Sequence, residues 1–110
     1  MIHKRLATGH EIDDAGYPAY EYKFCTADTA VKSTGGILHT ITITCNDAAP
    51  TAGSVIIYDN SAESGDVIFN HTFTTTPFVP LTVTLDCIFY RGCYVGFTTT
   101  NDVNVTVTYM

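Results

Sequence analysis

The stretch ILHTITITC, residues 37–45, alternates apolar and hydroxyl side chains with a period of two. The apolar phase holds Ile37, His39, Ile41, Ile43 and Cys45, and the opposite phase holds three threonines. Successive side chains of a β-strand point to opposite faces, so the pattern predicts a strand with one buried face. On this pattern His39 is expected to be a hydrogen-bonded residue of the apolar face and not a catalyst.

The same alternation recurs along the chain between short turns rich in Gly, Pro, Asn and Asp. It predicts further strands at 19–25, 30–33, 55–58, 66–73, 79–87, 93–97 and 103–109. No window has the 3.6-residue apolar stripe of an amphipathic helix. Short, evenly spaced strands that each bury one face predict an all-β fold, an antiparallel and jelly-roll-like β-sandwich of about seven or eight strands.

The first residues behave differently from the rest. Residues 1–17 carry charges and glycines but no sustained period, so we expect an N-terminal arm or leader. Residues 18–110 form the expected β-sandwich domain. A chain of 110 residues suffices for one such core.

The charge and hydropathy of the chain restrict the classes of partner that it is expected to bind. The chain has five Lys and Arg residues and eleven Asp and Glu residues, for a net charge of −6, so nucleic acid is not expected as a partner. No apolar run approaches the roughly 18 residues that a spanning helix needs, so no membrane partner is expected either. The first residues lack an apolar signal segment, and we therefore expect synthesis in the cytoplasm with Cys25, Cys45, Cys87 and Cys93 reduced.

The sequence offers no constellation that would support catalysis. It contains no C-x2-C, G-x-S-x-G, phosphate-binding loop or H-E-x-x-H motif. The acidic pair Asp13 and Asp14 lies in the arm, which is a poor support for a rigid acid and base. We expect a protein that is not an enzyme and that carries no cofactor and no metal.

The predicted outward phases are rich in threonine, with few of the Lys and Glu side chains that usually face water. They hold Thr40, Thr42, Thr44, Thr82, Thr84, Thr106 and Thr108. Threonine suits a pleated surface and keeps it neutral. Two interpretations stay open: a sandwich with neutral faces, or a subunit whose faces pack on copies of itself or on a larger assembly at low desolvation cost.

The order of several segments resembles a known type of protein. The segments are 31–33 (VKS), 36–41 (GILHTI), 57–60 (IYDN) with Gly65, 91–95 (RGCYV) and 105–109 (VTVTY). In this order they resemble small virion proteins of tailed bacteriophages, of the capsid decoration (cement) or head-fibre type. The resemblance covers about residues 20–109. It implies a β-sandwich, often trimeric, that binds the capsid lattice and has no catalytic residues.

The resemblance makes a capsid decoration protein the leading functional hypothesis. Such a protein would stabilise the head from the capsid surface of the virion, with the major capsid protein and its own copies, as a homotrimer, for partners. The candidate partner-binding residues lie in the arm: Lys4, Arg5, Leu6, Ile12 and Tyr17. The alternatives are a tail, collar or head-fibre component, and a carbohydrate-binding β-sandwich. For the last, the candidate aromatic residues are Tyr17, Tyr20, Tyr22 and Tyr94, although the chain has no Trp.

Overall fold

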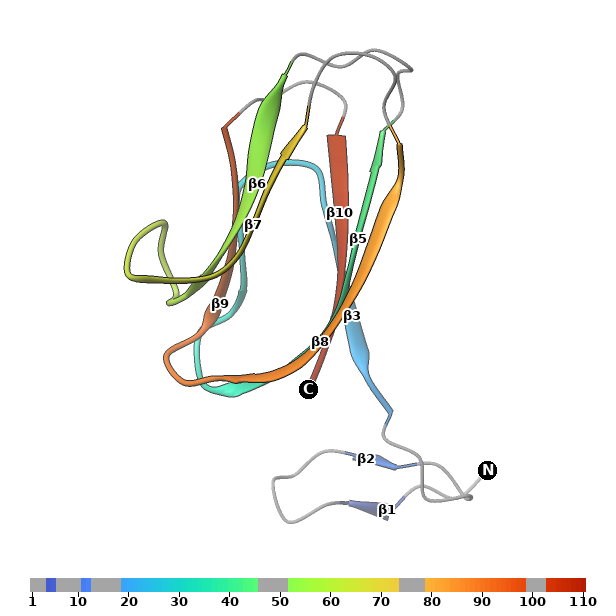
Figure 1. Cartoon of the computed structure of the whole chain (residues 1–110). Helices are drawn as coiled ribbons and strands as arrows, with labels where there is room; N and C mark the ends of the chain where they lie inside the picture. Colours follow the sequence, from blue (N-terminus) through green and yellow to red (C-terminus); the bar gives the residue numbers. More distant parts are fainter. Residues whose placement is uncertain (1–3, 6–10, 13–18, 46–51, 74–78, 99–102) are drawn as a thin grey trace.

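The chain folds as ten β-strands in a computed structural model that describes residues 4–5, 11–12, 19–45, 52–73, 79–98 and 103–110. The described residues contain no helix. The strands are β1 (Lys4–Arg5), β2 (Glu11–Ile12), β3 (Glu21–Cys25), β4 (Thr29–Lys32), β5 (Gly36–Cys45), β6 (Gly53–Asp59), β7 (Asp66–Phe73), β8 (Leu81–Phe89), β9 (Cys93–Phe97) and β10 (Val103–Tyr109). Figure 1 shows β3 to β10 as two facing layers.

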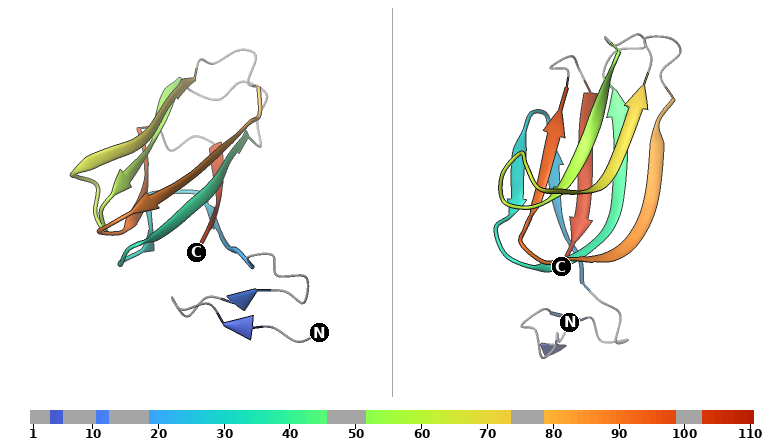
Figure 2. Two further views of the ribbon diagram at one scale, coloured as in Figure 1. Left: turned by 60° about the horizontal axis from the view of Figure 1, so that its bottom comes forward. Right: turned by 60° about the vertical axis from the view of Figure 1, so that its left-hand side comes forward.

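The two layers are four-stranded sheets in which every pairing is antiparallel. One sheet has the order β3-β10-β5-β8 and the other has the order β4-β9-β6-β7 (Figure 2). Strand β3 pairs with β10, β4 with β9, β5 with β8, and β6 with β7. The chain is therefore one long hairpin, folded at the turn between β6 and β7 and rolled into two layers, which is the jelly-roll arrangement.

The predicted fold class is confirmed, and so are the predicted strands. All eight predicted segments overlap a strand of the sandwich, with ends that differ by two residues at most. The period-two pattern worked because each strand keeps one face against the other sheet. The N-terminal segment adds one feature that its sequence did not predict: β1 and β2 pair antiparallel, with Lys4 opposite Ile12 and Arg5 opposite Glu11.

The core lies between the two sheets. Its largest fully buried side chains are Phe89, Leu38, Ile41, Ile43, Ile57, Val55, Val95, Val105 and Val107. Burying each of these side chains stabilises the fold by about 1.5–3 kcal/mol relative to an exposed position. Cys25 and Cys93 are buried with them as small apolar residues. All four cysteines lie in the described part of the chain, and none forms a disulfide there, in agreement with the predicted reduced state.

The prediction that His39 lies on the apolar, inward face of its strand is wrong, whereas the predicted hydrogen bonding of its side chain is confirmed. The register of β5 shifts at this residue against both neighbours, between Leu38 and Thr40 on the β8 side and opposite Thr108 and Tyr109 on the β10 side. This bulge reverses the phase of the strand, so that Leu38 is buried before it and Ile41 is buried after it. His39 is therefore turned to the outer surface, and Ile37 before it is 37% exposed.

The turn between β8 and β9 connects the two sheets and is held in place by the end of β6. The Asp59 carboxylate, at the end of β6, accepts hydrogen bonds from the backbone N–H groups of Tyr90 and Arg91, both at 2.8 Å. The next residue, Gly92, has φ of +149°. A Cβ there would lie 2.8 Å from the Lys32 carbonyl oxygen and 2.9 Å from the Asn60 carbonyl oxygen. The turn therefore needs glycine at this position both for its conformation and for the close backbone approach.

Candidate functional site

Two rows of threonines cross the outer face of the sheet β3-β10-β5-β8. One row runs through Tyr22, Thr108, Thr40 and Thr84, and the second runs through Phe24, Thr106, Thr42 and Thr82. We call these eight residues, together with Ile37 and Ile88, the threonine face. The rows arise because three T-x-T segments, far apart in the sequence, come into register on neighbouring strands. The predicted outward orientation of these six threonines is confirmed.

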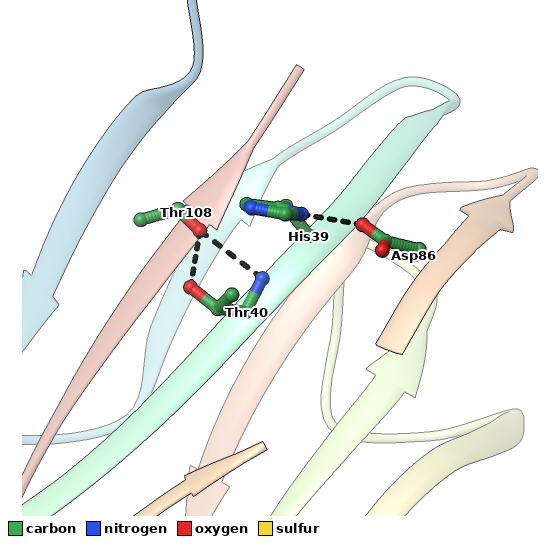
Figure 3. A network of polar contacts seen from close by, with 4 residues as sticks. All are labelled: His39, Thr40, Asp86 and Thr108. Carbon is green, nitrogen blue, oxygen red and sulfur yellow. Dashed lines mark hydrogen bonds and ion pairs between the residues drawn. The ribbon is translucent and has the colours of Figure 1, made fainter. Parts of the chain in front are cut away.

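The threonine hydroxyls bond to one another across the strands. The Thr40 and Thr108 hydroxyls form a hydrogen bond, and the Thr40 backbone N–H donates to Thr108 Oγ1 at 3.1 Å (Figure 3). The Thr42 and Thr82 hydroxyls are 3.2 Å apart. A hydroxyl offers one donor and two acceptor positions, so these bonds leave capacity for contact with another molecule. The rows therefore form a neutral surface that can both donate and accept hydrogen bonds.

Exposed aromatic side chains border the rows on the side of β3, which is an edge strand. Cys25 at the end of β3 is buried, which sets the phase of the strand and turns Tyr22 and Phe24 outward. Tyr22 is 74% exposed and Phe24 is 54% exposed. At one end of the same sheet, Ile37 lies opposite Ile88, which is 60% exposed. The threonine face thus combines central hydroxyls with apolar margins.

The bulge at His39 brings three side chains together next to the threonine rows. His39 Nδ1 and the Asp86 carboxylate form a hydrogen-bonded pair (Figure 3). The His39 ring stacks on Tyr20, with centroids 4.0 Å apart and planes 5° from parallel. Asp86 has φ of +46°, a left-handed conformation that Asp tolerates better than most residues. Among the described residues on this outer face, charge is confined to this pair.

A second cluster lies on the outer face of the other sheet. The Asp28 carboxylate accepts a hydrogen bond from the Phe97 backbone N–H at 2.8 Å. The negative charge of Asp28 is the main cause that raises the pKa of the Glu63 carboxyl beside it. The rings of Tyr58 and Tyr94 meet edge to face, with centroids 6.4 Å apart. Two carboxyl groups of like charge therefore sit together beside a tyrosine pair.

Burial and these carboxylates also raise the pKa of the Tyr94 hydroxyl. Partial burial is the first cause of its raised pKa, and the charges of Asp28, Glu63 and Tyr58 act in the same direction. The sequence could not single out Asp28 and Glu63 as neighbours, because they come from separate turns and meet only through the pairing of the strands.

The structure describes three of the five residues that were predicted to bind a partner. Lys4 and Arg5 form β1, and Ile12 closes β2 opposite Lys4. Leu6 and Tyr17 lie outside the described residues. The role of all five therefore stays a prediction. The threonine face, by contrast, combines six threonines that the sequence had marked as outward with four exposed apolar side chains that it had not: Tyr22, Phe24, Ile37 and Ile88.

Within the described residues, no three His, Cys, Asp or Glu side chains come together in a way that could hold a metal ion. None of the described segments is a helix long and apolar enough to cross a membrane.

Comparison of the chain with protein-family models, with curated proteins and with solved structures found no match.

Proposed function

We propose that this chain is a structural subunit of a tailed-bacteriophage virion, a capsid decoration protein that binds the major capsid lattice as a homotrimer and stabilises the head. The proposal combines the resemblance in the segments from 31–33 to 105–109 with the jelly-roll fold, which viral capsid proteins use among many other classes. The fold alone does not select a function, so a surface must carry the argument.

The observation that carries the proposal is the threonine face. None of its ten residues carries a charge, and the bonded pair of His39 and Asp86 lies beside it, although the chain as a whole has a net charge of −6. Covering a neutral face costs little desolvation, and its hydroxyls can exchange water for protein partners. On a symmetric lattice many weak contacts act together, so that each contact needs only modest affinity. A subunit of a shell fits these properties.

The direct test is co-sedimentation with heads purified from the phage that encodes the chain. The proposal predicts saturable binding to expanded heads and greater resistance of the decorated heads to heat. Failure to sediment with heads, together with absence of the chain from purified virions, would reject the decoration role. Presence in tails or fibres instead would favour the tail, collar or head-fibre alternative, as would a gene position among tail genes.

The arm gives the decoration role a second test. Removal of residues 1–17 is expected to leave the melting temperature of the isolated protein nearly unchanged and to weaken binding to heads. If the shortened chain unfolds, the boundary at residue 18 is wrong. If it binds heads as well as the full chain does, the sandwich domain and not the arm makes the contact with the head.

A carbohydrate-binding module is the second candidate, because one observation favours it. Tyr22 and Phe24 expose their rings directly beside threonine hydroxyls, and sugars bind to surfaces that combine aromatic rings with polar groups. Titration calorimetry with bacterial surface polysaccharides tests this function. Saturable heat that disappears in Tyr22→Ser would support it over the decoration role.

A further inference from the structure

We infer that the threonine face is the surface on which copies of this chain pack against one another. The inference rests on the proposed function, in which the chain is one of many identical subunits, and it names the partner of that face. The face meets the conditions for self-association in three respects: hydrogen bonding, apolar margins and size.

The hydrogen-bonding character of the face suits a second copy. A surface that packs on itself must avoid placing like charges opposite one another. Carboxylates only accept hydrogen bonds and ammonium groups only donate them, whereas a hydroxyl does both. Rows of Thr40, Thr42, Thr82, Thr84, Thr106 and Thr108 can therefore bond to the same rows of another copy, directly or through water. A partner of different composition would not require this symmetry.

The margins of the face expose apolar side chains that a partner would cover. Seven large apolar residues are exposed in the described part of the chain, and four of them belong to this face: Tyr22, Phe24, Ile37 and Ile88. Tyr22 and Phe24 belong to an edge strand. They point to the outer surface because Cys25, in the opposite phase of the same strand, is buried. A gathering of exposed apolar side chains around a polar centre is typical of a protein interface, where Tyr and Phe are enriched.

The size of the face is sufficient. The four strands β3, β10, β5 and β8 have five, seven, ten and nine residues, and at a spacing of about 4.8 Å and a rise of about 3.4 Å per residue they cover a flat area of about 500 Å². Projecting side chains enlarge the accessible surface beyond this flat area. A standard interface buries about 800 Å² on each partner, so this one sheet face can supply most of an interface.

The test uses two pairs of matched variants and measures mass by sedimentation velocity and light scattering. Thr82→Glu places a charge on the threonine face. Thr72→Glu places the same charge on β7, the edge strand of the other sheet, where Thr72 is also exposed and bonded to one hydroxyl, that of Ser54 at 3.0 Å. Phe24→Ser and Val67→Ser form the second pair, since both residues are 54% exposed and lie on different sheets.

The wild-type chain is expected to form a defined oligomer, with a mass that is a multiple of 12.0 kDa. Thr82→Glu and Phe24→Ser are expected to weaken association by about tenfold or more, because they repel or remove contacts inside the interface. Thr72→Glu and Val67→Ser should associate as the wild type does. Circular dichroism checks that each variant is folded. If Thr82→Glu unfolds, the comparison of Phe24→Ser with Val67→Ser still tests whether the threonine face is the interface.

Three outcomes would overturn the inference: a monomeric wild type at high micromolar concentration, undiminished association of both variants of the face, or equal weakening by the control variants. Binding to heads is measured separately on the same samples. A monomer that binds heads would refute self-association and leave the decoration role standing. An oligomer that ignores heads and is absent from virions would refute the decoration role and leave the interface standing.

Discussion

Tyr20 and His39 lie face to face, with ring centroids 4.0 Å apart and planes 5° from parallel. Tyr20 precedes β3 and His39 belongs to β5, and the sheet places β10 between these two strands. The stack therefore joins two strands that are not neighbours in the sheet. It fastens the edge strand β3, which carries Tyr22 and Phe24, to the middle of the sheet.

Loss of the His39 ring should loosen β3. His39→Ala is expected to lower the free energy of unfolding by about 0.5–1.5 kcal/mol, the usual contribution of a stacked aromatic pair. His39→Phe keeps a ring and removes the bond to Asp86, so it should retain part of that stability. Urea denaturation compares the variants, and hydrogen exchange should show faster exchange at residues 21–25 in His39→Ala. Equal losses in both variants would assign the role to the Asp86 bond instead.

Asp59 should stabilise the β8–β9 turn through its two hydrogen bonds from backbone N–H groups. Asp59→Ala is expected to lower the free energy of unfolding by about 1–3 kcal/mol, because hydrogen bonds to a charged acceptor exceed those between neutral groups. Asp59→Asn keeps an acceptor oxygen and should cost less. Urea denaturation measures both variants. An Asp59→Ala variant as stable as the wild type would show that water replaces the carboxylate without cost.

The pair of Glu63 and Asp28 predicts a stability that depends on pH. The Asp28 charge raises the pKa of Glu63, so the folded chain holds the Glu63 proton more tightly than the unfolded chain does. This stabilisation is complete below the unfolded pKa and is lost as the pH rises through the folded pKa. Glu63→Gln should therefore melt at a higher temperature than the wild type at pH 7, and the difference should vanish below about pH 4, where Glu63 is protonated.

Glu21→Gln is the matched control for Glu63→Gln, since it removes the same charge from β3. A similar rise in melting temperature in both variants at pH 7 would attribute the effect to net charge and not to the Asp28 pair.

Burial of Cys93 predicts sensitivity to alkali. Burial is the main cause that raises the pKa of this thiol to about 12, and the charges of Cys25, Cys87 and Asp59 add to it. The folded state thus keeps the proton that the unfolded state gives up near pH 9, and stability should fall as the pH rises from about 9 towards 12. One such group steepens the fall by up to about 1.4 kcal/mol per pH unit. Cys93→Ala should flatten the dependence measured by urea denaturation between these pH values, and an unchanged slope would contradict the assignment.

The sequence predicted the sandwich well because each strand buries one face. Alternation at 66–73, 93–97 and 103–109 matched the bounds of the strands to the residue. Alternation at 37–45 was ambiguous at its start, where Ile37 and Leu38 are both apolar and either can face the core. The bulge resolves this in favour of Leu38, and only pairing with β8 and β10 reveals it.

The threonine face could be predicted only in part. The T-x-T segments of β5, β8 and β10 marked threonines as outward, yet a sequence does not show which strands become neighbours. Their alignment in rows depends on pairings between residues as far apart as Thr40 and Thr108. The partner of Asp86, His39, was missed for the same reason, since β8 and β5 meet only in the folded sheet.

Oxidative footprinting with hydroxyl radicals tests most directly whether the threonine face is a contact surface. Phe24 and Val67 are both 54% exposed in the single chain, and they lie on the outer faces of different sheets. With rising protein concentration, and again on heads, the oxidation rate of Phe24 should fall several-fold while that of Val67 stays constant. A Phe24 rate that remains unchanged under both conditions, relative to Val67, would show that the face stays open to water and would contradict the account.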